Sequence, residues 1–250
     1  MSTINLIEDT DLINVIGRGE FDDLCVLIDH ITDRGKGRIS VSSDVCRRLM
    51  AARDAGIAGP DIRALIVEEL CRFGGNSLMN LLRGGSGVAY KEIVRDVAKR
   101  VKATVKANSS CAQMEMSILL RVLEQSMEKM TEEQKEQLFA EFGAGYVRGT
   151  GPATMTALIT AIRVSGFGAY KMAAVVANAV AKAMLGRGLA FGTTAGMMRG
   201  ISVFAGPIGW AITAIWTAFD LASPAYRVTV PCVIQIAYMR QRAMTNLSTL

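Results

Sequence analysis

Apolar residues recur through most of the chain at the three- and four-residue spacing of an α-helix, and alternating strand patterns are scarce. After Pro60 and Asp61, which suit a helix start, one apolar face continues to Phe73. Residues 110–130 have a second such face, made of methionine and leucine, which is typical of a core helix. The pattern therefore predicts an all-α fold, a helical bundle.

The same spacing predicts further helices over 20–32, 41–54, 87–107, 132–142, 152–164 and 168–198. Another should begin after Gly206 and Pro207, because proline suits the first helical turn. Pro224 and Pro231 precede a last helix, which we expect to end near Met244.

The C-terminal half contains a glycine-rich apolar segment. Four glycines recur at intervals of four from Gly188 to Gly200, and twenty residues from Gly200 to Phe219 carry no charge. Each glycine lowers the stability of a helix by up to about 1 kcal/mol relative to alanine, and close packing between helices can offset that loss. The segment therefore predicts a helical hairpin over 188–222 that turns at Ala205–Gly209. The residues assigned to its packing or insertion are Gly188, Gly192, Gly196, Gly200, Pro207, Trp210, Trp216 and Asp220.

Three roles are open for this hairpin: a buried core, conditional membrane insertion, or a permanent membrane span. A span fits least well, because Ile208–Ala222 would measure about 22 Å as a helix against a hydrocarbon core of about 30 Å. Asp220 lies in that piece and is expected to pair with Arg199 or Arg227, since an isolated buried charge is costly.

Charge divides the chain. Residues 1–142 contain 22 of the 23 acidic and 19 of the 28 basic residues, which gives a net charge of −3. Residues 143–250 contain nine basic residues and one acid, which gives +8. We therefore expect an acidic to mixed helical half and an apolar, cationic helical half, divided at the glycine-rich segment Gly143–Pro152, although one continuous domain stays open. The cationic half is expected to bind an anionic partner, to dock against the acidic half, or to do both.

A basic stripe is predicted on the helix over 87–107. Its members, which fall within about 80° of one helical face, are Lys91, Arg95, Lys99, Lys102 and Lys106. Valines occupy the opposite side. The stripe is either a solvated face or a site for the phosphates of lipid headgroups or nucleic acid. No aromatic residues interleave it, so nucleic acid is the less favoured partner.

Candidate chemistry is sparse. Every histidine-based catalytic or metal scheme would have to use His30, the single histidine, at the end of a predicted helix. The five cysteines form no CxxC pair and fit small core residues in a reducing compartment. We therefore predict no catalytic residue, metal or cofactor, and a cytoplasmic protein that associates conditionally with membrane.

Two blocks resemble one protein family: "FGGNSLMNLLRGGSGVAYKEIVRDVAKRVK" and "GPIGWAITAIWTAFDLASPAYRVTVPCVIQIAYMRQR". Both are similar to the bacterial YaaW family, sometimes labelled as related to a ubiquinol-cytochrome c chaperone. The resemblance covers nearly the whole chain apart from about 108–185 and brings no catalytic motif. It implies a role in phage defence as an infection sensor that brings in a separate effector.

The resemblance therefore implies, in agreement with the sparse chemistry and the cationic apolar half, a non-enzymatic antiphage defence protein that senses an infection-associated membrane or vesicle and recruits an effector encoded nearby. One alternative is a pore-forming or membrane-disrupting effector that acts through the 188–222 hairpin. Another is an enzyme or nucleic-acid binder that uses the basic helix. Homo-oligomerisation is left open.

Overall fold

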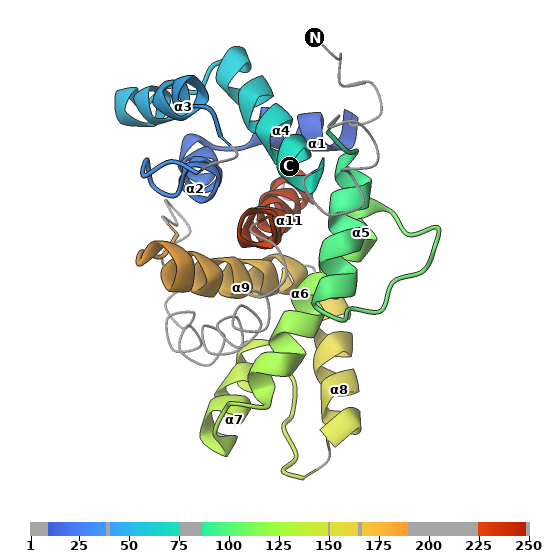
Figure 1. The fold of residues 1–250 in the computed structure, drawn as a ribbon. Helices are drawn as coiled ribbons and strands as arrows, with labels where there is room; N and C mark the ends of the chain where they lie inside the picture. Colours follow the sequence, from blue (N-terminus) through green and yellow to red (C-terminus); the bar gives the residue numbers. More distant parts are fainter. Residues whose placement is uncertain are drawn as a thin grey trace.

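The computed structural model describes residues 10–38, 41–75, 87–149, 151–164, 167–189 and 225–248 (Figure 1). Within these ranges every regular element is an α-helix, which confirms the all-α prediction. The helices are α1 (Thr10–Arg18), α2 (Phe21–Thr32), α3 (Ser43–Ala55), α4 (Pro60–Gly75), α5 (Tyr90–Arg100), α6 (Cys111–Met127), α7 (Glu132–Glu141), α8 (Gly151–Val164), α9 (Gly168–Leu185) and α11 (Tyr226–Ser248).

The last helix, α11, is the centre of the fold. It packs against α1, α2, α4, α5, α6 and α9, and Figure 1 shows it between α2 and α4 on one side and α9 on the other. Every residue from Val228 to Gln241 is buried. Such a helix must be buried all round, because it is apolar on most of its faces.

Pro231 lies inside α11, whereas we predicted from the sequence that it precedes the last helix. A proline there removes one backbone hydrogen bond and crowds the carbonyl four residues earlier. The helix nevertheless begins at Tyr226, because contacts with six other helices outweigh that local cost.

Two predicted helices end early, and both corrections affect candidate residues. Helix α5 ends at Arg100 instead of 107, because Lys102 takes a left-handed φ of 59° and the Ala103 amide donates back to Ala98. Helix α9 ends at Leu185 instead of 198, because Gly186 at φ 68° closes it.

Helix α1 was not predicted. It has nine residues, and its buried side chains are Leu12 and Ile16. So short an apolar face gives a weak periodic signal, and an isolated helix of this length is unstable in water. Its stability comes from packing against α4 and α11.

Helices α8 and α9 meet at a sharp bend of 115°. Gly168 permits this approach, since a Cβ atom there would lie 2.6 Å from the carbonyl oxygen of Ile162. Within the described ranges no single helix is long and apolar enough to cross a bilayer, whereas α8 and α9 taken together would be by length and composition. Helix α9 is mostly buried, as expected for a core helix.

The described core is continuous from Leu12 in α1 to Met239 in α11. It includes residues from both sides of the glycine-rich segment at 143–152, which connects α7 to the start of α8. Whether the chain divides into two halves at 143–152 or forms one continuous domain stays a prediction.

Candidate anion-binding surface

Helix α5 presents cations on one face and packs with the other. Lys91, Arg95 and Lys99 follow one another at four-residue intervals, so they share a face of the helix. The side chains buried on the other side are Tyr90, Ile93, Val94, Val97 and Ala98. Lys91 and Lys99 are exposed, and Arg95 is half-buried. This part of the helix has the amphipathic arrangement expected from the sequence.

Lys102 and Lys106 do not continue that helical face, which corrects the predicted stripe of five. Both lie in the connection between α5 and α6, and both are exposed. The connection is held against α5 where the Arg95 guanidinium donates to the Ala107 carbonyl at 3.5 Å. The Lys106 amide also donates to the Ser109 hydroxyl at 3.2 Å.

The exposed lysines of this region are weakly neutralised. Lys99 lies 3.7 Å from Asp96, and both side chains are largely exposed, so their ion pair contributes little. Lys91, Lys102 and Lys106 form no ion pair with any residue that the structure describes. The region therefore offers positive charge to solvent.

Two arginines near the end of α11, Arg240 and Arg242, by contrast lie largely buried in ion pairs. Arg240 donates from Nε to Glu115 Oε2 at 2.7 Å and from Nη1 to Asp11 Oδ1 at 2.6 Å. The hydroxyl of buried Tyr90 donates to Glu115 Oε1 at 2.8 Å. Burial lowers the pKa of Arg240, but Glu115 and Asp11 outweigh that effect and raise it above its usual value. This network joins α1, α5, α6 and α11.

A second buried cluster surrounds Asp23 in α2. Its carboxylate accepts hydrogen bonds from Arg242 and, at 3.3 Å, from Gln235. Arg242 also lies 3.1 Å from Glu20. Burial raises the pKa of Asp23 to about 6, and the opposite charge of Arg242 offsets this only in part.

Asp29, also in α2, is a third buried acid. It accepts from Arg53 at 2.7 Å and from Arg187, which follows α9. Five basic residues after position 142 thus pair with acids before it: Arg148, Lys171, Arg187, Arg240 and Arg242. The acidic and basic parts of the chain therefore neutralise each other in part within one molecule.

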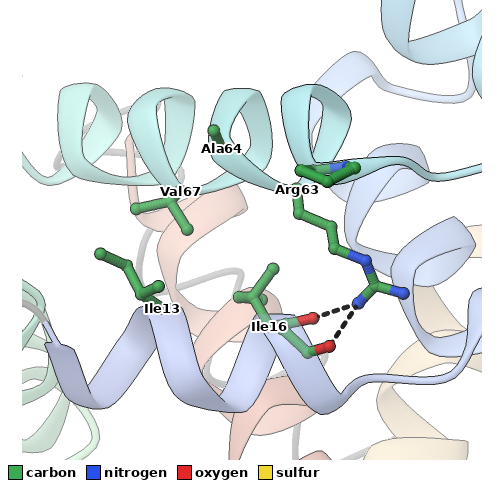
Figure 2. Close-up of a pocket in the computed structure, with 7 residues that line it drawn as sticks. Ile13, Ile16, Arg63, Ala64 and Val67 are labelled. Carbon is green, nitrogen blue, oxygen red and sulfur yellow. Dashed lines mark hydrogen bonds between the residues drawn. The ribbon is translucent and has the colours of Figure 1, made fainter.

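An apolar groove of about 410 Å³ lies between α1 and α4. In Figure 2, Ile13 and Ile16 from α1 face Val67 from α4 across it. The Arg63 guanidinium lies at one end and donates to the last carbonyls of α1, those of Ile16 and Gly17. Arg63 therefore caps α1, and its guanidinium is engaged by the protein itself.

The candidate reactive side chains are largely buried. His30 lies in the last turn of α2, as predicted, and burial together with Arg38 and Arg187 lowers its pKa to about 3, so it stays neutral. Cys25, Cys71 and Cys232 are buried, the other two thiols are half-buried, and none of the five forms a disulfide. Among the described residues no group of three His, Cys, Asp or Glu side chains could hold a metal ion.

Of the hairpin candidates, the structure describes Gly188. It is exposed and lies after the end of α9, where a Cβ atom would lie 2.5 Å from Asn178 Oδ1. The adjoining Leu189 amide donates to that same oxygen at 2.9 Å. The other candidates lie outside the described residues: Gly192, Gly196, Gly200, Pro207, Trp210, Trp216 and Asp220.

Sequence reasoning missed the buried ionic clusters. Asp11 and Arg240 are 229 positions apart, so no local pattern connects them. A weak signal was present, because Arg240 and Arg242 occur at the end of an otherwise apolar run. Charged residues in such a place require partners.

Comparison with known proteins identifies relatives. The family model "Ubiquinol-cytochrome C chaperone" matches residues 66–234. A "UPF0174 protein" of Helicobacter pylori (strain J99) is 39% identical over 176 residues, which cover 70% of this chain and 69% of the relative. A second UPF0174 protein of that strain is 35% identical and covered over 87% of its length.

"UPF0174 protein YaaW" of Escherichia coli (strain K12) is 29% identical over 242 residues, which cover 95% of this chain and 96% of the relative. No solved structure gives a significant match. The chain belongs to this family, which confirms the resemblance seen in its two sequence blocks.

Proposed function

We propose that this UPF0174 family member is a non-enzymatic antiphage defence protein that senses early infection and recruits a separate effector protein. It contacts an anionic, infection-associated membrane or vesicle through an exposed basic surface, to which we assign Lys91 and Lys99 on the solvent face of α5 and Lys102 just after the end of that helix. Lys106 and Arg95 flank that surface.

The observation that carries the proposed membrane contact is the contrast in how cations are used, while the defence and effector roles rest on the family resemblance. Arg240 and Arg242 are buried against acids, whereas Lys91 and Lys102 are exposed and form no ion pair with a described residue. Anionic lipid attracts a basic residue near its surface with a free energy on the order of 1 kcal/mol. Three lysines that contact the lipid together would therefore strengthen vesicle binding by more than tenfold.

Charge reversal tests the membrane contact. The test variant carries Lys91→Glu, Lys99→Glu and Lys102→Glu, and its binding to vesicles of equal phosphatidylglycerol and phosphatidylcholine is measured by co-sedimentation. The matched control carries glutamate at three other exposed lysines and therefore has the same net charge: Lys36, Lys129 and Lys182. We expect the test variant to bind at least tenfold more weakly and the control to change less than twofold.

Equal losses in the two variants would contradict the proposal, because binding would then follow net charge and not this surface. The defence role is tested by phage plating on cells that carry the native gene neighbourhood. The test variant should lose protection while the control keeps it. Protection by the test variant equal to that of the wild type would overturn the role of this surface.

Effector recruitment has its own readout. The product of the adjacent gene should co-purify with the wild-type protein from infected cells and not from uninfected cells. Growth arrest on expression of this chain alone would instead favour the membrane-disrupting alternative through residues 188–222.

A further inference from the structure

A cleft of about 620 Å³ opens where the connection after α5 and the first turns of α6 meet the ends of α8 and α11. Its size lies in the range of small-molecule sites. Its lining includes two basic residues, one carboxamide and three apolar side chains: Lys106, Arg163, Gln241, Met116, Leu120 and Met244. The surface formed by Lys91, Lys99 and Lys102 contributes none of its side chains to the lining.

The cleft is electropositive. Lys106 and Arg163 come from different elements, are both exposed, and form no ion pair within the described ranges. None of the described lining residues is acidic. Ala112 and Gln113, in the first turn of the 17-residue helix α6, also line it, so the positive end of that helix adds to the field.

Gln241 gives an independent indication of a ligand. The residue is 9% exposed and lines the cleft, yet its carboxamide has no hydrogen-bond partner among the described residues. The carboxamide atoms reach solvent inside the cleft, so they are accessible to a bound group. A carboxamide can donate to an anionic oxygen or accept from a hydroxyl.

Part of the lining is apolar, beside the polar side chains of Thr104, Asn108, Ser109, Gln113 and Ser117. Met116 and Leu120 form part of the wall on α6, and Met244 of α11 is 54% exposed beside them. Methionine side chains adapt to ligands of irregular shape. Cationic groups and an apolar wall in one cleft match a molecule that combines an anionic head with a hydrocarbon part.

We propose that this cleft binds a single-chain amphiphile with a phosphate monoester head. The head lies between Lys106 and Arg163 near the start of α6, with Gln241 donating to a phosphate oxygen. The chain lies along Met116, Leu120 and Met244. Two separate cations and a helix N-terminus suit a group with up to two negative charges better than a carboxylate with one. The site goes beyond the proposed membrane surface, and either can fail without the other.

Isothermal titration calorimetry with the full chain tests the ligand class. The probe is dodecyl phosphate below its critical micelle concentration, and saturable binding of one molecule per chain is expected. Inorganic phosphate has the head alone, and dodecyl maltoside has the chain with a neutral head. Both should bind at least tenfold more weakly. Binding of either as tightly as dodecyl phosphate would overturn the proposed ligand class.

Variants test the location. Lys106→Ala with Arg163→Ala should weaken dodecyl phosphate binding at least tenfold, and Gln241→Leu should weaken it about threefold or more. The matched control removes two exposed lysines outside both the cleft and the basic surface, by Lys36→Ala with Lys182→Ala, and should change affinity less than twofold. Equal effects of the two double variants would overturn the site. Because Lys106 and Arg163 are exposed, that variant should keep the wild-type thermal unfolding temperature.

Discussion

Helices α5 and α11 both carry basic residues, but they use them in opposite ways. In α11 the basic residues Arg240 and Arg242 are largely buried, and each pairs with two acids from the first half of the chain. In α5, Lys91 and Lys99 lie on the solvent side. Arginine suits buried pairs because its planar head binds carboxylates through several hydrogen bonds, whereas lysine is strongly hydrated. The positive charge of the chain therefore divides into a structural part and an available part.

The largest effect is expected from removing Arg240. Arg240→Leu leaves the carboxylate of Glu115, which is 1% exposed, buried without a cation, with the Tyr90 hydroxyl still donating to it. Breaking a buried pair from one side typically costs about 3–5 kcal/mol. We expect a loss of that size in the free energy of unfolding, measured by urea denaturation followed by circular dichroism.

The double variant Arg240→Leu with Glu115→Leu provides the control for that loss. Because it removes both charges, it should be more stable than the sum of the two single losses predicts, by at least 1 kcal/mol. Additive losses would mean that Arg240 and Glu115 do not depend on one another.

Much of this fold could be predicted from the sequence, because several helices begin at residues whose side chains mark a helix start. Ser110 and Thr131 each form a capping box with a glutamine three residues later, and the helices that follow them were placed closely. The ends of α5 and α9 were missed. A glycine such as Gly186 suits both close helix packing and a left-handed helix end, and the local sequence does not distinguish the two.

The candidate surface was predicted in part. Spacing alone placed Lys91, Arg95 and Lys99 on one face, since that relation is local to a helix. Arg163 and Gln241 in the cleft could not be found, because tertiary packing brings them beside Lys106 from helices far apart in the sequence. The seven hairpin candidates beyond Gly188 stay predictions.

The pH dependence of stability tests the cluster around Arg242. The pKa of Asp23 is about 6 in the folded protein and 3.8 ordinarily, so between these values the folded state holds the proton more tightly. Stability contributed by this group is therefore present below about pH 4 and is lost as pH rises through about 6. The loss is on the order of 3 kcal/mol.

Asp23→Asn should abolish this dependence. Urea denaturation at several pH values from 4 to 7 should show the wild type losing stability relative to the variant as pH rises. A constant difference between the two proteins, or a wild type that gains stability, would contradict the raised pKa.

A smaller effect is expected from the Tyr90 hydroxyl. Tyr90→Phe removes a buried hydrogen bond to the charged Glu115, which should cost about 1.5–3 kcal/mol. Tyr146→Phe removes a bond of similar length, 2.7 Å to Glu132 Oε2, at a more exposed place. Chemical denaturation of both variants should show a much smaller loss for Tyr146→Phe. Equal losses would show that burial does not make the Tyr90 hydrogen bond contribute more to stability than the Tyr146 hydrogen bond.

The smallest effect on folding is expected at the available cations. Lys91→Glu, Lys99→Glu and Lys102→Glu together should change the free energy of unfolding by no more than about 0.5 kcal/mol, because exposed positions contribute little. Lys91 lies in the first turn of α5, where the helix dipole favours a glutamate. Lys99 lies in the last turn, where the dipole disfavours one, so the two effects offset each other. Thermal unfolding should therefore match the wild type, while binding to anionic vesicles falls. A large loss of stability would place these lysines among the structural cations and remove the contrast between α5 and α11 on which the proposed membrane contact rests.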